Sequence, residues 1–253
     1  MPDKLSLLIP VYNEATHLEK FFTMLSAVKM PCEVEYVFVD DCSSDESWEI
    51  IGKITAGRED CLTFRQSVNK GKGAALHKGI QCASGNIIAV QDADFEYDPR
   101  DLTKLVQPVM EDKADVVYGS RFHKSGSQVH RTIHYLINRF LTLVSNILSG
   151  LYLTDMETCY KVFKAEIIKG LVLESERFGF EPEVTAKLAK LKLRVHEFPI
   201  HYHPRNYLEG KKITWKDGVA ALWFILKFNC QRIESQVNDS LPKAYIPKNR
   251  QWL

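Results

Sequence analysis

The chain has 253 residues, of which 45% are apolar and 26% are charged. These fractions are typical of a globular protein and exclude a disordered, collagen-like or fibrous chain, and the length allows one large domain, or one domain with an appendage. Lysine and arginine together number 33 against 32 aspartates and glutamates, so no global electrostatic field attracts a polyanion and we expect no nucleic-acid partner.

The cysteine spacing and the apolar runs indicate the cellular compartment in which the protein works. The six cysteines form no Cys-x-x-Cys pair and follow no histidine spacing typical of zinc, so we expect reduced thiols in a cytoplasmic protein. The start of the sequence has no basic stretch followed by an apolar run and a cleavage site, which predicts no secretory signal. The longest apolar stretch, 133–153, is interrupted by His134, Asn138 and Arg139 and predicts no membrane-spanning helix.

Short apolar runs alternate with helical patterns through the first half of the chain. The predicted strands are 5–11, 34–39, 62–65, 87–91 and 116–119, and the predicted helices are 15–26, 45–55, 72–83 and 99–110. This alternation is the signature of a parallel sheet covered by helices. We therefore predict an α/β fold with a mostly parallel central sheet, and a nucleotide-binding half at 1–121.

The pattern changes after residue 121. A polar loop and a long apolar segment come first, and the elements predicted after them are a strand at 159–163, a helix at 182–191, a strand at 195–200 and an aromatic-rich helix at 215–228. We predict a single domain over 1–229 and a C-terminal tail at 230–253. The tail is polar and contains two prolines, so it either lies over the body or is poorly ordered.

Acidic residues gather where the predicted strands end. An acidic pair follows the second strand, and Asp92, Asp94 and Glu96 follow the fourth. Ligands bind parallel sheets outside the carboxyl ends of the strands, where several carboxylates repel one another unless a cation neutralises them. Hard oxygen ligands at alternating positions suit Mg²⁺ or Mn²⁺ arriving with phosphates. The alternative is that Asp92 and Asp98 only cap a turn and the helix that follows.

Familiar nucleotide-binding motifs are missing. No Gly-x-Gly-x-x-Gly follows the first strand, which disfavours a dinucleotide site, and 69–73 resembles a P-loop only superficially because Gln66 and Gly73 replace two defining residues. The segment can still offer backbone amides and the charge of Lys72 to a nucleotide at a helix N-terminus, or it is an ordinary exposed helix start. No nucleophile motif supports acyl-enzyme chemistry.

Five motifs occur in a fixed order: Ile9-Pro10-Val11-Tyr12-Asn13-Glu14, Val39-Asp40-Asp41-Cys42-Ser43-Ser44-Asp45, Asn69-Lys70-Gly71-Lys72-Gly73, Asp92-Ala93-Asp94 and Gly119-Ser120-Arg121. In order and spacing, from residue 5 to about 228, they resemble the family 2 glycosyltransferases. The likeness is strongest to the polyprenyl-phosphate (dolichyl-phosphate) mannose synthases. The resemblance implies the GT-A fold, with C-terminal amphipathic helices and an acceptor half at 122–229.

The resemblance also implies a nucleotide-sugar donor and a set of site residues. The positions that match its base- and ribose-binding residues are Pro10, Tyr12, Glu14, Val39 and Asp41. Asp92, Ala93 and Asp94 match the residues that bind ribose, diphosphate and Mg²⁺ or Mn²⁺, and Glu96 matches a second metal-side ligand. Arg121 meets the donor. Arg205 and Lys211 match the loop that closes over the diphosphate and the acceptor phosphate.

The chemistry of such a transfer depends on the acceptor. A departing nucleoside diphosphate needs cationic stabilisation more than a proton, which Asp94 with the metal, Arg205 and Lys211 supply. A lipid phosphate is already ionised at neutral pH and attacks without a base. A sugar hydroxyl needs a base, and Glu181 or Glu183 is the candidate, unless both only suit the dipole of a first helical turn.

Two segments depart from the family pattern. The sequence at 155–161 reads Asp-Met-Glu-Thr-Cys-Tyr-Lys where the mannose synthases carry Asp and then a Thr/Ser-Gly-x-Arg type stretch. Lys161 thereby replaces an arginine with a point charge. The pair Glu96-Tyr97 stands where the family often has Gln or Ser followed by His. The sugar, the base and the acceptor therefore stay open.

Two predicted helices are amphipathic. Polar residues recur every three or four positions within 133–151, and the tryptophans and lysines of 215–228 favour the headgroup zone of a bilayer. With the resemblance, we expect peripheral attachment to the cytosolic face of a membrane. The alternative is that both helices pack against the sheet or against a second subunit in a homo-oligomer.

These observations together predict an inverting, metal-dependent glycosyltransferase. It moves a hexose, mannose or glucose, from a GDP- or UDP-sugar to a polyprenyl phosphate. One alternative is a family 2 transferase acting on a saccharide hydroxyl in glycan or cell-surface polysaccharide synthesis. An alternative of another class is a nucleotide-sugar-binding subunit without turnover, which has no need for the whole charge set described above.

Overall fold

The structure is a computed structural model that describes residues 2–122, 132–204 and 215–247. Its strands are β1 (Lys4–Val11), β2 (Glu33–Asp40), β3 (Cys61–Arg65), β4 (Ile87–Val90), β5 (Val116–Ser120), β6 (Lys161–Lys164) and β7 (Val195–Pro199). Its longer helices are α1 (Leu18–Ser26), α2 (Ser47–Thr55), α3 (Lys72–Cys82), α4 (Leu102–Met110), α5 (Thr132–Ser149), α6 (Ala165–Gly170), α7 (Phe180–Leu188) and α8 (Trp215–Cys230). The described residues also form the short 3-10 helices η1 (Pro99–Asp101), η3 (Ile233–Ser235) and η4 (Lys243–Tyr245).

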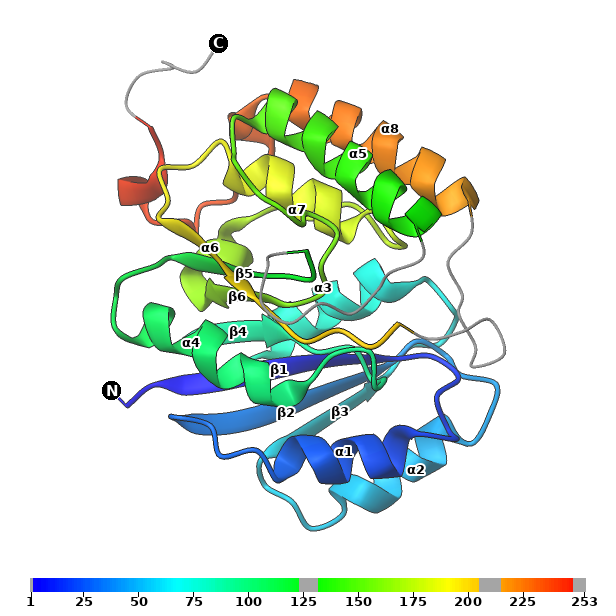
Figure 1. The fold of residues 1–253 in the computed structure, drawn as a ribbon. Helices are drawn as coiled ribbons and strands as arrows, with labels where there is room; N and C mark the ends of the chain where they lie inside the picture. The colour runs from blue at the N-terminus through cyan, green and yellow to red at the C-terminus, as the bar shows by residue number, and fades with distance from the viewer. Residues whose placement is uncertain (1, 123–131, 205–214, 248–253) are drawn as a thin grey trace.

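All seven strands form one sheet in the order β3-β2-β1-β4-β6-β5-β7, flanked by helices (Figure 1). The pairs β1–β2, β1–β4, β2–β3 and β5–β7 are parallel, and only the two pairs made by β6 are antiparallel. β4 is buried along its whole length, as expected of a strand covered on both faces. The predicted α/β class with a mostly parallel sheet is confirmed.

The predicted elements of the first half are present with shifted boundaries. Helix α2 begins at Ser47, two residues after the predicted start, because the Asp45 carboxylate accepts hydrogen bonds from the amides of Ser47 (3.0 Å) and Ala15 (3.1 Å). An aspartate engaged in this way favours a turn over a helix interior. Helix α6 was not predicted, since six residues between two buried segments give too short a pattern.

β6 is present close to the predicted strand at 159–163, but the sequence pattern did not give its direction. Its Val162 pairs with Ala89 of β4 on one side and with Val117 of β5 on the other, both antiparallel. A strand that runs against its neighbours begins where they end. The segment 155–160, which precedes β6, therefore lies beside the carboxyl ends of β4 and β5.

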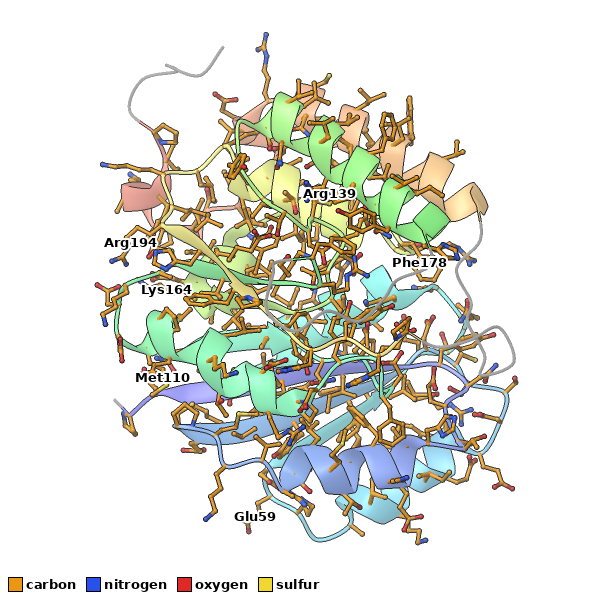
Figure 2. All side chains as sticks on the ribbon, in the orientation of Figure 1. Glu59, Met110, Arg139, Lys164, Phe178 and Arg194 are labelled. Carbon is orange, nitrogen blue, oxygen red and sulfur yellow. The ribbon has the colours of Figure 1, made fainter. Side chains whose placement is uncertain are left out.

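The opposite edge of the sheet carries a separate group of ion pairs. Asp115, just before β5, lies 2.9 Å from Lys164 Nζ and 2.7 Å from Arg194 Nη2, and both cationic residues lie together near the start of β7 (Figure 2). The two cations hold the pKa of Asp115 far below its usual range although burial alone would raise it. This cluster joins β5, β6 and β7 at the edge away from the predicted site.

The described part of the C-terminal tail packs against α6. Val237 forms a bridge with Leu171, and Leu241 is buried over Gly170, where an added methyl group would lie 2.7 Å from its side chain. Tyr245 accepts a hydrogen bond from the Lys192 amide at 2.8 Å. Residues 230–247 thus lie over the body of the protein.

Helices α5 and α8 lie side by side at one end of the molecule, with α7 between them and the sheet (Figure 1). Their outward faces are apolar, and carbon-rich side chains project from them (Figure 2). The exposed members are Leu136, Ile137, Phe140, Leu143, Ile147, Leu148, Val219, Trp223 and Leu226, and we call this set the apolar face. Among the described helices, none has both the length and the apolar content to cross a bilayer.

Gly73 offers a test of the packing at the start of α3. A methyl group added there would lie 2.1 Å from the Ser175 carbonyl oxygen. We expect Gly73→Ala to lower the free energy of unfolding, measured by denaturant titration, by about 1–3 kcal/mol, the usual cost of overpacking.

Gly52 in α2 is the matched control, because a methyl group there meets nothing within 4 Å. Gly52→Ala should raise the free energy of unfolding by about 0.5–1 kcal/mol, since alanine is the better helix former. Two variants of equal stability would contradict the close approach at Gly73.

Candidate active site

The carboxyl ends of β1, β2 and β4 align at one edge of the sheet. Pro10 is in register with Val39, and the chain leaves β4 through Gln91, whose amide donates to the Leu8 carbonyl at 2.9 Å. Asp92 therefore lies level with Pro10. This register brings the predicted base-, ribose- and diphosphate-binding segments to the same edge.

The loops after β1 and β2 are tied to each other. The Asn13 amide donates to Ser43 Oγ at 3.0 Å, and its side-chain oxygen accepts from the Ser44 amide at 2.8 Å. Asn13 has φ of 52°, a left-handed conformation that asparagine tolerates better than most residues. Tyr12, beside this junction, is 38% exposed. Glu14 is partly buried, and its amide donates to Ser47 Oγ at 2.9 Å.

Asp41 is buried and fastens the loop before α3. Its carboxylate accepts hydrogen bonds from the amides of Lys70 (2.8 Å) and Gly71 (2.7 Å), and from the side chains of Gln66 (2.8 Å) and Asn69 (2.9 Å). Burial raises the pKa of Asp41, and the two backbone hydrogen bonds act against that rise. The predicted base- and ribose-binding carboxylate is thus at the site edge, but its hydrogen bonds go to the protein.

Three of the amides in 69–73, the segment predicted to offer amides to a nucleotide, donate to the protein instead. Those of Lys70 and Gly71 donate to Asp41, and that of Gly73 donates to the Arg177 carbonyl at 3.2 Å. The next amide, of Ala74, donates to the Glu176 carbonyl at 2.8 Å. The glycines let the backbone of 175–177 approach the start of α3, which a P-loop interpretation does not anticipate.

Lys72 links the turn after β4 to α7. Its Nζ lies 2.9 Å from Asp92 Oδ1 and 3.1 Å from Glu181 Oε1. Burial alone would lower the pKa of Lys72, but the two carboxylates outweigh it and hold the pKa well above its ordinary value. Lys72 is therefore a permanent cation beside Asp92.

Asp92, Asp94 and Glu96 do not form the three-carboxylate metal site that alternation along the chain predicts. Asp92 faces Lys72, Asp94 Oδ1 accepts the Glu96 amide at 3.0 Å, and Glu96 Oε2 accepts the Tyr202 hydroxyl at 3.1 Å. Across the described residues, no three acidic, histidine or cysteine side chains are arranged to hold an ion. The tight turn points successive carboxylates at different partners, so the expectation of a common direction is wrong.

The residues at this turn nevertheless fit a cation that enters with its substrate. Mg²⁺ is commonly bound by one or two carboxylates plus substrate phosphates, with waters completing the shell, rather than by an all-protein cage. Asp94, with Asp92 beside it, supplies hard oxygen atoms of this kind. Lys72 provides the positive charge that lets the Asp92 carboxylate lie close to Glu181.

Arg121 is held by Asp155, a residue to which the sequence assigned no role. Its Nε and Nη2 lie 2.7 and 2.8 Å from the two Asp155 oxygens, and its amide donates to the same carboxylate at 3.0 Å. The guanidinium also lies 5.2 Å from the Tyr202 ring centroid. Only the antiparallel placement of β6 brings Asp155 to the end of β5, so local sequence could not reveal the pair.

Lys161 holds its own turn and does not take the place of a donor-binding arginine. It is fully buried, and its Nζ donates to the Met156 carbonyl at 3.1 Å and to the Thr158 carbonyl. Burial lowers the pKa of Lys161, while nearby acids oppose the change.

The two glutamates proposed as bases have different surroundings. Glu183 is fully buried, accepts the amides of Glu174 and Ser175 at 2.7 Å each, and pairs with Lys187 at 2.5 Å. Those contacts give Glu183 a structural role. Only Glu181 reaches the site, where it contacts Lys72. Arg205 and Lys211 lie outside the described residues.

Comparison with known proteins identifies the family. The model of glycosyl transferase family 2 matches residues 6–171. The chain belongs to glycosyl transferase family 2. This glycosyltransferase has the predicted enzyme class, and the resemblance read from its five motifs is confirmed.

Two relatives with named activities align with most of this glycosyltransferase. A dolichol-phosphate mannosyltransferase of Pyrococcus furiosus is 27% identical over 83% of the chain, and a dodecaprenyl-phosphate galacturonate synthase of Rhizobium johnstonii is 29% identical over 81%. The chain spans 60% of the length of each of these two relatives.

A solved structure confirms the predicted GT-A fold. Glucosyl-3-phosphoglycerate synthase from Mycobacterium tuberculosis, in complex with Mn²⁺, uridine diphosphate and glucosyl-3-phosphoglycerate, superposes with a TM-score of 0.67. The two proteins are 16% identical, over 89% of this chain and 80% of that one.

Asp41 generates a test of the site's framework. In Asp41→Asn one carboxylate oxygen becomes an NH₂ group that faces donors, so we expect the free energy of unfolding to fall by about 2 kcal/mol or more. Denaturant titration measures the change. Asp239→Asn, at an exposed position, is the control and should change it by less than about 0.5 kcal/mol. Equal effects would argue against the buried role of Asp41.

Proposed function

We propose that this glycosyltransferase moves a hexose, mannose or glucose, from a GDP- or UDP-sugar to a polyprenyl phosphate, with inversion at the sugar carbon. The observation that carries the proposal is the pairing of Lys72 with Asp92 and of Arg121 with Asp155 at one edge of the sheet. The two named relatives act on polyprenyl phosphates by their names, and the mycobacterial synthase was solved with Mn²⁺ and uridine diphosphate.

The donor would lie along the ends of β1, β2 and β4. Tyr12 and Glu14 line the end of β1, where the exposed Tyr12 ring offers a surface for a nucleobase. Pro10 and Val39 bring the two backbones side by side beneath it. Asp41 acts from below by holding the 66–71 loop in place.

The residues that would hold Mg²⁺ or Mn²⁺ are Asp94 and, beside it, Asp92. When bound, the cation supplies positive charge that stabilises the departing nucleoside diphosphate. Lys72 adds a fixed cation next to Asp92, and Ala93 is small enough to be buried between the two aspartates. We expect Arg121, Arg205 and Lys211 to add positive charge around the phosphates.

The contacts of Glu181 and Glu183 bear on which class of acceptor the enzyme uses. A polyprenyl phosphate is ionised near neutral pH and attacks without a base. Glu183 is buried and bound to backbone amides, so it is not placed to act as a base. Glu181 is already paired with Lys72. This arrangement favours an acceptor that brings its own negative charge over a neutral saccharide hydroxyl.

The apolar face supports attachment to a membrane surface. Ile147 is 72% exposed and Trp223 is 63% exposed, an uncommon degree of exposure for large apolar residues gathered on one surface. Lys227 of α8 pairs with Glu174 at 2.9 Å at the border of the face. Two helices lying in the headgroup region would hold the protein where a lipid-linked acceptor resides.

The transfer is tested with a panel of GDP- and UDP-hexoses and a short polyprenyl phosphate, with products identified by mass spectrometry. We expect turnover with Mg²⁺ or Mn²⁺ that is lost on chelation, and a fall of at least about 100-fold in kcat/KM for Asp94→Ala, since one charge-stabilising group is worth that much. Asp239→Asn is the control and should match the wild type.

Two results would contradict the proposal. Transfer to a saccharide hydroxyl, abolished by Glu181→Gln, would replace it with the alternative acceptor class. Nucleotide-sugar binding without turnover under every condition would leave a binding subunit.

Membrane attachment is tested by sedimentation with vesicles of phosphatidylcholine and phosphatidylglycerol. Phe140→Glu should lower the bound fraction about tenfold, since it removes one large apolar side chain from the interface and adds a charge. Met24→Glu on α1, an exposed apolar position at the other end of the molecule (Figure 1), should leave binding unchanged. Equal losses for both variants, or no binding by the wild type, would contradict attachment through the apolar face.

A further inference from the structure

Glu157 lies near acids that are each paired with a cation, but among the described residues it has no such pair itself. Asp92 and Glu181 share Lys72, and Asp155 is paired with Arg121. Within 2–122, 132–204 and 215–247 no cation pairs with the carboxylate of Glu157, and its Oε1 is buried without a hydrogen bond to these residues. Buried polar atoms in native proteins are almost always satisfied, and an exception points to a ligand, a water or a functional role.

The turn around Glu157 is fixed. Lys161 Nζ donates to the carbonyls on both sides of it, those of Met156 and Thr158. The preceding Asp155 is held by Arg121 and by its own amide, which donates to Glu197 at 3.1 Å. The backbone at Glu157 is therefore held from both sides, and a residue on a fixed backbone can select one ligand geometry over another.

The charges around Glu157 limit what it can bind. Glu181 and Asp155 oppose an added negative charge, while Lys161 and Arg121 oppose an added cation. Burial, reinforced by Glu181, raises the pKa of Glu157 to about 7. Near neutral pH the carboxyl group can therefore both donate and accept hydrogen bonds. A neutral hydroxyl is the ligand chemistry that suits such surroundings.

The position of Glu157 indicates which part of the substrate carries this hydroxyl. The 155–160 segment, which contains Glu157, leads into β6 and so lies beside the ends of β4 and β5, where the Lys72–Asp92 and Arg121–Asp155 pairs are found. A nucleotide sugar whose diphosphate lies near Asp92 and Asp94 places its hexosyl group next to them. We propose that Glu157 is a specificity-determining residue that hydrogen-bonds a hydroxyl group of the transferred hexose. The inference rests on the proposed function, since it needs a nucleotide-sugar donor.

Calorimetry tests the proposed role of Glu157. It compares the affinity for the nucleoside diphosphate alone with the affinity for the matching nucleotide sugar, with Mg²⁺ present. Glu157→Ala should leave the diphosphate affinity within twofold of the wild type and lower the nucleotide-sugar affinity by on the order of 10- to 100-fold. Glu157→Gln should lose less, since an amide still bonds a hydroxyl. Glu176→Gln, an exposed glutamate in the segment that contacts the start of α3, is the control and should change neither affinity.

Deoxy-sugar donors sharpen the test. For one ring position, removing the hydroxyl should cost the wild type as much as Glu157→Ala does, and should cost the alanine variant little more, because both changes remove the same hydrogen bond. If the alanine variant fails to fold, as judged by circular dichroism, the same cycle is run with Glu157→Gln, which keeps the shape of the side chain.

Three results would overturn the inference. The first is an unchanged ratio of the two affinities in both Glu157 variants. The second is an equal loss of both affinities, which would give Glu157 a role in the nucleotide site alone. The third is additive costs at every ring position. Nucleotide-sugar binding by the wild type in any of these cases would leave the proposed function intact, whereas no nucleotide-sugar binding by the folded wild type would remove both.

Discussion

The Lys72 ammonium is the contact on which the arrangement of the site depends. It lies within 3.1 Å of carboxylates from two parts of the chain, Asp92 after β4 and Glu181 in α7. Without it the two acids would repel each other. The backbone adds to this link, because Gly73 allows the 175–177 segment to close against the start of α3, where the amides of Gly73 and Ala74 donate to its carbonyls. The start of α3 thus joins the turn after β4 to α7 and to the segment that precedes α7.

A second constraint is the direction of β6. As the antiparallel strand between β4 and β5, it delivers the 155–160 segment to the edge where the acidic turn lies. That placement pairs Asp155 with Arg121 and leaves Glu157 with an unsatisfied buried oxygen. The site edge thus combines two carboxylate–cation pairs with a buried Glu157 oxygen that has no hydrogen-bond partner in the described part of the chain, in a family whose members transfer sugars. Specific recognition of a hydroxylated ligand is the chemistry that such a combination supports.

The sequence predicted the parts of this protein that local pattern determines. The alternation of apolar runs and helical periods gave the order of the first strands and helices, and parallel strands then require Asp41 and Asp92 to meet at one edge. It did not predict which partner each side chain takes. Asp41 faces backbone amides, Glu96 faces Tyr202, and Glu183 faces Lys187. These contacts depend on turns and on crossings between distant segments, which composition and spacing along the chain do not encode.

The central claim is that Asp94, at the turn after β4, receives a divalent cation together with the diphosphate of the donor. Anomalous diffraction at the manganese edge, from crystals grown with Mn²⁺ and a nucleoside diphosphate, tests it most directly. The account predicts one strong anomalous peak in contact with the Asp94 carboxylate and with diphosphate oxygens, beside the Lys72–Asp92 pair. A diphosphate bound elsewhere, or bound at this edge with no manganese at Asp94, would contradict it.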